Sequence, residues 1–383
     1  LLALASSAAV EAHTIFTTLY VNGVSQGDGV GIRMRKDPKT ADYPISLNDS
    51  AMACGYDGEQ GNPRVISVND GDTLSFEWRA IGDDPSKGAI DPGHYGPCGI
   101  YLKKVDSATN DQGVGDGWFK LWDEGYDEST SQWCNQKLGG ADDYGVYQHR
   151  LSIDLPSGLQ GGYYLARPEI LALHKAVDNP PDPQFYTGCA QIYLKSDGTK
   201  LPQSTVSIPG YVQADDSSVT FNVYDKPLHL PYDTPGPAVA NLIESGQTGA
   251  TIGQGSQSEG TLPAKCVMEN GGWCGYEVAA YDNMTGCYAA AQDCWNQNTD
   301  CWNYASKLPT GGVPWCNDWA DKCQNIDDQC DAKNYDGPPD DGKDLTPSPT
   351  SISVVMAAAT SNLQAAVEKV AGSTAAASSE YAA

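Results

Sequence analysis

Five histidines are the side chains from which this chain could build a metal site, and the first has a distinctive place. His13 follows Leu1–Val10, a small, apolar stretch with the composition of a secretory signal peptide, and Val10–Ala12 fits a small-residue cleavage site. Cleavage after Ala12 would give His13 a free α-amine beside its imidazole. The amine and Nδ1 can bind one metal ion together, because an amine with a pKa of about 8 loses its proton easily. The simpler alternative is that His13 is an ordinary residue that follows the cleavage site.

Two more histidines lie where they could serve such a site. His94 lies among the turn residues 92–97, just before a strand-like run, so its side chain could project from the end of a strand. His174 ends the apolar run 170–173. Taken alone, His94 is more often an ordinary surface residue, and His174 is more often a buried structural histidine. Of the remaining two, His149 is expected to be a solvent-facing strand residue and His229 has no motif around it; neither is assigned a role.

A glutamine and a tyrosine lie in a later strand-like run that ends at Cys189. Strand alternation places Gln184 and Tyr186 on one face of that strand. A tyrosine beside a cysteine in a strand is more often part of the core. The pair therefore points to chemistry only if the fold brings it to the histidines.

The elements that must position these residues are short strands. From residue 13 to 239, runs rich in Val, Ile, Tyr, Phe and Thr alternate with turn residues; 73–78 and 217–224 are two such runs. This pattern predicts an all-β fold, an antiparallel, immunoglobulin-like β-sandwich. Long loops are expected over 24–63 and 105–145, and long loops of a sandwich usually carry function.

The composition restricts the partners and the compartment. A net charge of −26 disfavours nucleic acid and anionic membrane as partners and is compatible with a neutral polymer such as polysaccharide. After the leader, no stretch is apolar enough to span a membrane. Twelve cysteines behind a signal peptide indicate disulfides and a secreted, extracellular protein. Asn48 and Asn283 lie in glycosylation motifs.

The chain divides further after residue 239. Residues 1–12 are the signal-peptide remnant, 240–263 have the composition of a flexible linker, 264–336 form a cysteine-rich module, and 337–383 are expected to be a disordered tail. The module has either a purely structural role or a role in binding polysaccharide through its tryptophans.

Cysteines of the module repeat every seven residues in two groups, Cys287, Cys294, Cys301 and Cys316, Cys323, Cys330. Seven residues are two helical turns, so each group lies on one face of a helix. Two antiparallel helices would pair the first group with the second in reverse order, and Cys266 would pair with Cys274. The eight cysteines allow about a hundred pairings, so this disulfide-stapled helical hairpin is a hypothesis.

Together, these motifs resemble the fungal lytic polysaccharide monooxygenases of auxiliary activity family 9, formerly glycoside hydrolase family 61. The resemblance covers residues 13–238. It rests on five motifs in the family's order: a histidine at the mature N-terminus, His-x-Gly-Pro at His94, Ala-Leu-His at His174, Gln-x-Tyr-x-x-Cys from Gln184, and Pro-Gly-Pro at 235–237. The chain departs from the family at 167–169, Arg-Pro-Glu in place of Arg-His-Glu, and its spacing from His174 to Gln184 is one residue longer.

The resemblance implies a copper site. His13 would bind one copper ion through its amine and a ring nitrogen, His94 would supply a third nitrogen, and Tyr186 would occupy the axial position. His174 and Gln184 would lie around the copper ligands and steer oxygen species, and Tyr232 would be an exposed aromatic that stacks on a sugar ring. Cys54 would pair with Cys189. The two remaining cysteines, Cys98 and Cys134, are expected to form the second bridge.

The function that the resemblance implies is oxidative cleavage of cellulose or another β-1,4-glucan at C1, C4 or both. The reaction would use O2 or H2O2, and electrons would come from a small-molecule reductant or an extracellular dehydrogenase. The protein is expected to be a monomer. A hydrolase is one alternative, but many acidic pairs could supply its two carboxylates and none stands out. A copper- or carbohydrate-binding protein without catalysis is another, and three nitrogen ligands also suit zinc.

Overall fold

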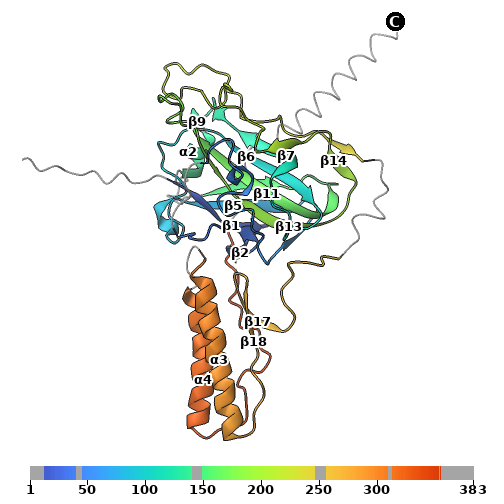
Figure 1. The fold of residues 1–383 in the computed structure, drawn as a ribbon, viewed down its shortest axis with the longest axis vertical. Coiled ribbons are helices and arrows are strands. Elements are labelled where there is room, and N and C mark those ends of the chain that lie inside the picture. Colours follow the sequence, from blue (N-terminus) through green and yellow to red (C-terminus); the bar gives the residue numbers. More distant parts are fainter. Residues whose placement is uncertain are drawn as a thin grey trace, which may run out of the picture.

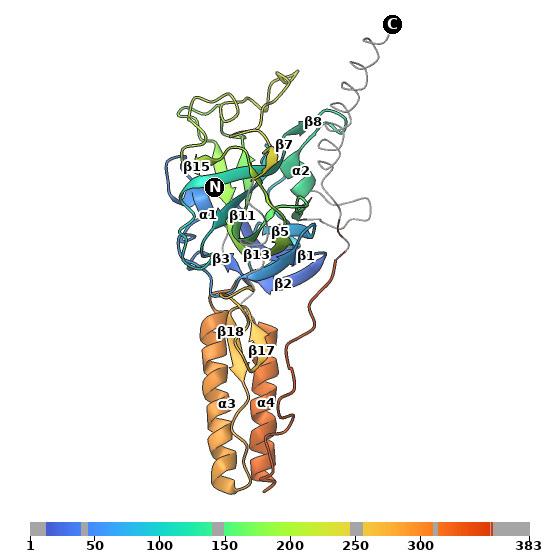
Figure 2. The same cartoon turned by 90° about the vertical axis from the view of Figure 1, so that its right-hand side faces the viewer.

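A computed structural model describes residues 13–39, 45–139, 149–245, 256–308, 313–352 and 354 of the chain. Two β-sheets pack face to face as a sandwich, and two long helices extend away from it (Figures 1 and 2). The helices are joined to each other by disulfides. The expected fold class, an all-β sandwich followed by a small disulfide-stapled helical module, is therefore confirmed.

The smaller sheet is antiparallel and has the strand order β10-β5-β1-β2. Its strands are β1 (Ile15–Val21), β2 (Val24–Asp28), β5 (Thr73–Arg79) and β10 (Arg150–Asp154). The expected strand 73–78 is β5. Because β1 and β5 are paired along their whole length, the start of β1 has a fixed place in the sandwich. His13 lies two residues before that start.

The larger sheet has the order β15-β7-β6-β11-β13-β3, with β12 paired to β11 and β4 paired to β13. Its strands are β3 (Ile32–Arg33), β4 (Ile66–Asn69), β6 (Cys98–Val105), β7 (Gly115–Glu124), β11 (Gln160–Ala172), β12 (Gln184–Thr187), β13 (Cys189–Asp197) and β15 (Val206–Ile208). Among the strand pairs of the described residues, only β13 with β4 is parallel.

Alternation along β6 shows how the core is built. Ile100 and Leu102 face the smaller sheet and lie in one buried cluster with Phe16 and Trp78, whose rings are 5.9 Å apart. Tyr101 points to the other face of the larger sheet, into a second buried cluster formed by loops and short helices. Both faces of the larger sheet are therefore covered. The loops are fixed by packing, so they can hold side chains at the end of the sandwich.

Short elements and two disulfides fix these loops. The elements are α1 (Ala51–Cys54), the 3-10 helix η1 (Pro85–Lys87), α2 (Cys134–Gly139), and two strand pairs, β8 (Tyr126–Asp127) with β9 (Gln132–Trp133) and β14 (Lys200–Pro202) with β16 (Leu242–Glu244). Cys54–Cys189 ties α1 to β13, and Cys98–Cys134 ties β6 to α2. Both pairings are those that the resemblance implied.

One expected strand is wrong. Residues 217–224 form turns instead of a strand. Asn222 accepts a hydrogen bond from the backbone N–H of Tyr224 at 3.0 Å, and the N–H of Thr220 donates to the carbonyl of Asp216 at 3.2 Å. Such local bonds give the backbone an alternative to a strand ladder. The apolar residues of this run serve a loop core, where Val219 is fully buried.

The cysteine-rich module is a helical hairpin with a small sheet on one side. Helices α3 (Met284–Ala305) and α4 (Val313–Asp331) are joined by Cys287–Cys330, Cys294–Cys323 and Cys301–Cys316. Strands β17 (Cys266–Asn270) and β18 (Trp273–Tyr276) are joined by Cys266–Cys274. All four pairings are those predicted from the cysteine spacing. No helix of the described residues is both long enough and apolar enough to cross a bilayer.

The expected flexible linker is wrong where the structure describes it. Residues 242–244 form β16, and Glu259 accepts hydrogen bonds from Ala108 N at 2.5 Å and Thr109 Oγ1 at 2.9 Å. The N–H of Val65 donates to the carbonyl of Gly260 at 2.9 Å. These bonds hold the segment on the sandwich. Residues 246–255 lie outside the described part.

The first part of the expected disordered tail also packs on the protein. The N–H of Leu345 donates to the carbonyl of Val267 at 2.6 Å, and the N–H of Ile352 donates to that of Gly23 at 2.9 Å. The segment therefore runs from the hairpin back to the sandwich, as Figure 2 shows. The signal-peptide remnant, residues 1–12, and most of the tail, residues 355–383, lie outside the described part.

Candidate metal centre

Four of the predicted site residues lie at the ends of neighbouring strands. His13 precedes β1, and His94 lies in the turn before β6. His174 lies two residues after the end of β11. Tyr186 lies within β12, which is paired to the end of β11. The sandwich topology therefore brings together residues that are far apart in the sequence.

The rings of these residues form one cluster. The ring centroids of His94 and His174 are 3.9 Å apart, and those of His13 and Tyr186 are 6.3 Å apart in an edge-on arrangement. His13 and His174 both lie close enough to His94 to lower its pKa by charge repulsion. All four residues thus surround a single small region.

His94 has the properties of a metal ligand. Its side chain is buried, at 8% exposed, and its Nδ1 has no hydrogen-bond partner among the described residues. Asp91 Oδ1 is the nearest charged atom, at 3.7 Å, too far for a hydrogen bond. Burial, helped by His174 and opposed by Asp91, lowers the pKa of His94 to about 4. The imidazole is therefore neutral above that pH and keeps a lone pair for a metal.

Tyr186 is held by a short hydrogen-bonded chain. Its hydroxyl donates to Gln184 Oε1 at 3.1 Å, and Gln184 Nε2 donates to Asp182 Oδ2 at 3.0 Å. Tyr186 is fully buried, and this burial, with the charge of Asp182, raises its pKa. The phenol therefore stays protonated at neutral pH. A neutral phenol is at most a weak ligand, consistent with an axial place.

His174 completes the cluster beside this chain. Its Nδ1 is buried without a hydrogen-bond partner in the described part of the chain, and burial together with Lys175 lowers its pKa. The loop after His174 closes where the N–H of Asp182 donates to the carbonyl of Lys175 at 3.0 Å. This closure places Asp182 beside the glutamine.

The cluster fits a copper ion with nitrogen ligands better than it fits a metal site built from three or more His, Cys, Asp or Glu side chains. The described residues contain no group of three or more His, Cys, Asp or Glu side chains that could hold a metal ion. Two imidazoles and the α-amine of a processed His13 would make three nitrogen ligands, a set that suits Cu(II). The partnerless nitrogen of His94 is consistent with this set. The amine itself depends on cleavage after Ala12, which lies outside the described residues.

Tyr232 is not the exposed aromatic that was expected. Its ring packs against Trp133 and Phe221, with centroids 4.9 Å and 5.0 Å away, and its hydroxyl donates to the carbonyl of Ser218 at 2.8 Å. It therefore stabilises the loop core. The exposed aromatic nearby is Tyr224, 53% exposed, whose ring lies 6.3 Å from that of Tyr95, the neighbour of His94.

Sequence reasoning missed two carboxylates and one aromatic. Asp91 lies three residues before His94 and Asp182 two residues before Gln184, so a search for acidic residues close to each candidate would have found both. Tyr224 gave no such signal, because its place depends on the turns that replaced the expected strand. Of the two unassigned histidines, His149 is buried, at 7% exposed, and does not face solvent as expected; its charged neighbours are Glu77, Arg150 and Arg79. His229 pairs with Asp225.

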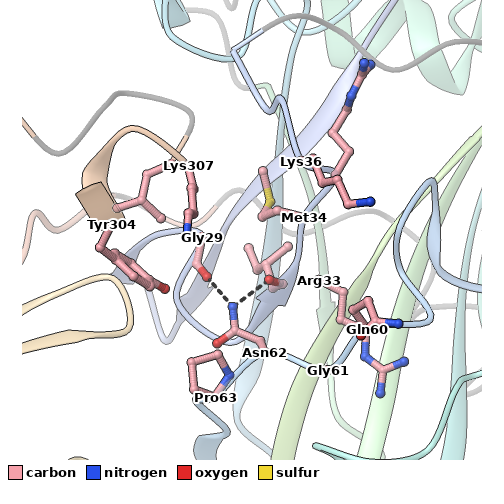
Figure 3. A pocket seen from close by; sticks show the side chains of 13 residues that line it. Gly29, Arg33, Met34, Lys36, Gln60, Gly61, Asn62, Pro63, Tyr304 and Lys307 are labelled. Atoms are coloured by element: carbon pink, nitrogen blue, oxygen red, sulfur yellow. Dashed lines mark hydrogen bonds between the residues drawn. The ribbon is translucent and has the colours of Figure 1, made fainter. Parts of the chain in front are cut away.

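A separate cavity lies between the sandwich and the helical module (Figure 3). It has a volume of about 360 Å³, and residues 29–36 and 60–63 face Tyr304 and Lys307 across it. Asn62 Nδ2 donates to the carbonyls of Gly29 and Ile32, which shapes one wall. None of the residues of the histidine cluster lines this cavity. It belongs to the junction of the two parts.

Comparisons with known protein families identify one match. The model of Auxiliary Activity family 9, formerly GH61, matches residues 13–232. A lytic polysaccharide monooxygenase C of this family from Aspergillus tamarii is 45% identical over 348 residues, which are 88% of this chain and 90% of the relative. A lytic polysaccharide monooxygenase H from Botryotinia fuckeliana is 48% identical over 348 residues, 88% of this chain and 77% of the relative.

The comparison with solved structures agrees for the sandwich. The structure of CvAA9A superposes with a TM-score of 0.52 at 32% sequence identity. It covers 59% of this chain and 97% of CvAA9A. The relatives from Aspergillus tamarii and Botryotinia fuckeliana each match 88% of this chain, compared with 59% for CvAA9A. Their similarity therefore extends into the helical module.

Proposed function

Because the chain belongs to auxiliary activity family 9, a family of lytic polysaccharide monooxygenases, we propose that it is a secreted, copper-dependent enzyme acting on cellulose or a related β-1,4-glucan. Membership of the family makes it an oxidoreductase that cleaves polysaccharide by oxidation. We propose oxidation at C1, C4 or both, with O2 or H2O2 as co-substrate. A small-molecule reductant or an extracellular dehydrogenase would supply electrons.

The observation that carries this proposal is the cluster of His13, His94, His174 and Tyr186. His13 would hold one copper ion through its amine and a ring nitrogen, and His94 would supply the third nitrogen. Tyr186 would be a further, weaker ligand through its phenol oxygen. Bound copper would supply one-electron redox chemistry toward the oxygen co-substrate.

The protein's own residues would orient this site and handle protons. His94 is neutral at the pH of most extracellular media, so it needs no deprotonation before it binds a metal. Gln184 has a fixed orientation, because its oxygen accepts from Tyr186 and its nitrogen donates to Asp182. His174, whose ring lies 3.9 Å from that of His94 at a tilt of 40°, would restrict the plane of that ring and could hold a proton at its buried Nδ1. Second-sphere contacts of this kind tune metal sites strongly.

The substrate would bind across the surface around the histidines. Tyr224 is the exposed aromatic there, and an aromatic face stacks on the apolar face of a sugar ring. The net charge of −26 does not oppose a neutral polymer. We therefore assign sugar stacking to Tyr224 in place of Tyr232.

The test uses the protein that begins at His13, loaded with copper and incubated with cellulose with and without ascorbate. Mass spectrometry of the products should show oxidised oligosaccharides only when reductant is present, and their fragmentation would separate C1 from C4 oxidation. Unoxidised sugars, formed regardless of copper or reductant, would instead support a hydrolase. Tight copper binding without products on any glucan would support a binding protein, and activity with zinc alone would overturn the assignment of copper.

A further inference from the structure

An aromatic stripe runs along one side of helix α3. It consists of Tyr288, Trp295 and Trp302, spaced by seven residues. Tyr288 is 45% exposed and Trp302 is 37% exposed, although large aromatic side chains on a small module are normally buried. The hairpin core is formed by the cysteines with Trp319 and Ile326, and the partly buried Trp295 packs against it. Tyr288 and Trp302 lie outside that buried cluster.

Two of the rings are held in place by the partner helix. The hydroxyl of Tyr288 donates to Asp331 Oδ1 at 2.8 Å, and Trp295 Nε1 donates to Asp327 Oδ2 at 2.8 Å. Both bonds cross from α3 to α4, so the rings lie over the groove between the helices. Rings fixed in this way lose little conformational entropy when they bind a ligand.

The stripe lies on the face of the hairpin that is left uncovered. The other flank of α3 meets the small sheet: Gln297 Oε1 accepts from the N–H of Tyr276 at 2.8 Å, and Tyr304 lies against Gly272. From α4, Trp319 packs on Trp273 of β18 with centroids 5.4 Å apart. Figure 1 shows β17 and β18 along one side of the two helices.

Several contacts hold the hairpin on the sandwich. Arg64 on the sandwich forms an ion pair with Glu269 of β17 at 2.9 Å, in a half-buried position. Glu259 binds the backbone N–H groups at 108 and 109 before the chain enters the module. The segment after α4 returns to the sandwich at Gly23. Contacts thus hold the module at both of its ends.

The spacing of the stripe indicates what it could bind. Seven residues of α-helix rise about 10 Å, so successive rings of the stripe are about one disaccharide repeat of an extended β-1,4-glucan apart. The carboxylates of Asp327 and Asp331 beside the rings can accept hydrogen bonds from sugar hydroxyls. The same carboxylates, in a chain with a net charge of −26, disfavour an anionic polymer or membrane.

We propose that Tyr288, Trp295 and Trp302 form a second binding surface for the β-1,4-glucan, on the helical module and in addition to the surface around the histidine cluster. This inference rests on the proposed function for the identity of the polymer. The module then acts as a fixed extension of the substrate-binding face. A polymer surface would touch both the sandwich and the hairpin at once, and simultaneous contact at two linked sites strengthens binding without new chemistry.

The experiment measures binding of the metal-free protein, beginning at His13, to insoluble cellulose by depletion from solution. The double variant Tyr288→Ala with Trp302→Ala should bind about tenfold more weakly, because two stacking contacts are lost. Tyr276→Ala is the matched control, since Tyr276 is 43% exposed on β18, on the opposite side of the hairpin. That control should bind like the unmodified protein. Equal binding of the double variant and the unmodified protein would overturn the proposal, and so would an equal loss in the control.

A second measurement avoids substitutions altogether. Hydroxyl-radical footprinting of the unmodified protein with and without cellulose should protect Tyr288 and Trp302 while Tyr276 stays reactive. Lack of protection at the stripe would contradict the proposal even if the double variant failed to fold. Because neither measurement depends on oxidised products, failure here would leave the proposed activity standing. Protection of the stripe by cellulose, together with a lack of oxidised products in the activity test, would support the binding surface and contradict the proposed activity.

Discussion

His94 combines burial with a neutral imidazole, and the cause lies in its surroundings. The ring centroid lies 3.9 Å from that of the tilted His174 ring, and its carboxylate neighbour Asp91 stays beyond hydrogen-bond distance. Repulsion and burial therefore prevail over Asp91 and lower the pKa to about 4. A buried nitrogen without a partner is costly in a protein unless a ligand binds it. This balance supports the proposed role of His94 as a metal ligand.

His94→Ala should weaken copper binding to the protein that begins at His13 by about 100-fold or more, since even changes outside the ligand set cost 10- to 100-fold. Isothermal titration with Cu(II) would measure the loss. His229→Ala is the matched control, because the His229 side chain is 82% exposed and pairs only with Asp225 in the described interactions. An unchanged affinity of the His94 variant would remove His94 from the ligand set.

Asp182→Ala should slow the release of oxidised oligosaccharides about tenfold with little change in copper affinity, because Asp182 acts through the orientation of Gln184. The decisive comparison is a double-mutant cycle. In a Gln184→Ala background, Asp182→Ala should have no further effect on the rate. Additive losses in the cycle would show that Asp182 acts independently of the glutamine.

Strand β11 shows how a departure from the family pattern is accommodated. Pro168 lies in the interior of this strand, where a proline normally breaks the ladder. Its partner on one side is Ile100 of β6, but on the other side β11 changes partner, from β13 at Ala166 to β12 at Glu169. Pro168 lies at that change, where the missing N–H removes no regular ladder bond. Strand β11 therefore continues past Pro168 to Ala172.

The neighbours of Pro168 form a buried ion pair. Arg167 is fully buried, its NH2 group is 2.7 Å from Glu169, and its guanidinium lies over the ring of Tyr101. Tyr211 donates its hydroxyl to the same carboxylate. Removal of one partner would leave the other charge buried and unpaired, which is far more costly than loss of an exposed pair.

Glu169→Ala should therefore lower the free energy of unfolding of the sandwich by about 3–5 kcal/mol. Urea unfolding followed by tryptophan fluorescence would measure it. Glu59→Ala, which removes an exposed carboxylate of the same charge, should change stability by less than about 0.5 kcal/mol. A similar, small effect of both variants would mean that the Arg167–Glu169 pair contributes little.

How well the elements could be predicted depended on how local their signals are. The heptad spacing of Cys287, Cys294 and Cys301 fixes a helix face within the segment itself, and the hairpin disulfides followed from it. The run 217–224 has strand composition, yet its turns are set by short-range bonds such as those of Asn222. The burial of Tyr232 depends on Trp133, about a hundred residues away, and no local pattern reports such a contact.

At the scale of the whole molecule, composition was misleading about the segments between and after the two parts. The Gly-, Ser- and Gln-rich stretch before the module reads as a linker, but a single carboxylate, Glu259, binds the loop at 107–109 through several donors. The tail segment up to Ile352 likewise adds backbone bonds to β17 and to the turn after β1. These contacts join distant parts of the chain, so they follow from the packed fold and not from composition.

Loss of the contacts at the junction should loosen the module from the sandwich and so reduce its contribution to polymer binding. In a double variant, Arg64→Ala with Glu259→Ala, the Arg64–Glu269 ion pair and the Glu259 hydrogen bonds are lost. Hydrogen bonds to charged groups contribute about 1.5–3 kcal/mol each, so small-angle scattering should show a more extended particle. Cellulose binding should weaken although the stripe Tyr288–Trp302 is intact, because a loosely attached site has a lower effective concentration at the polymer.

Asp341→Ala, at an exposed carboxylate away from the junction, is the control and should leave scattering and binding unchanged. Unchanged scattering in the double variant would show that the returning segment at Gly23 alone is enough to fix the module. A more extended particle with undiminished cellulose binding would show that the position of the module does not matter for binding the polymer.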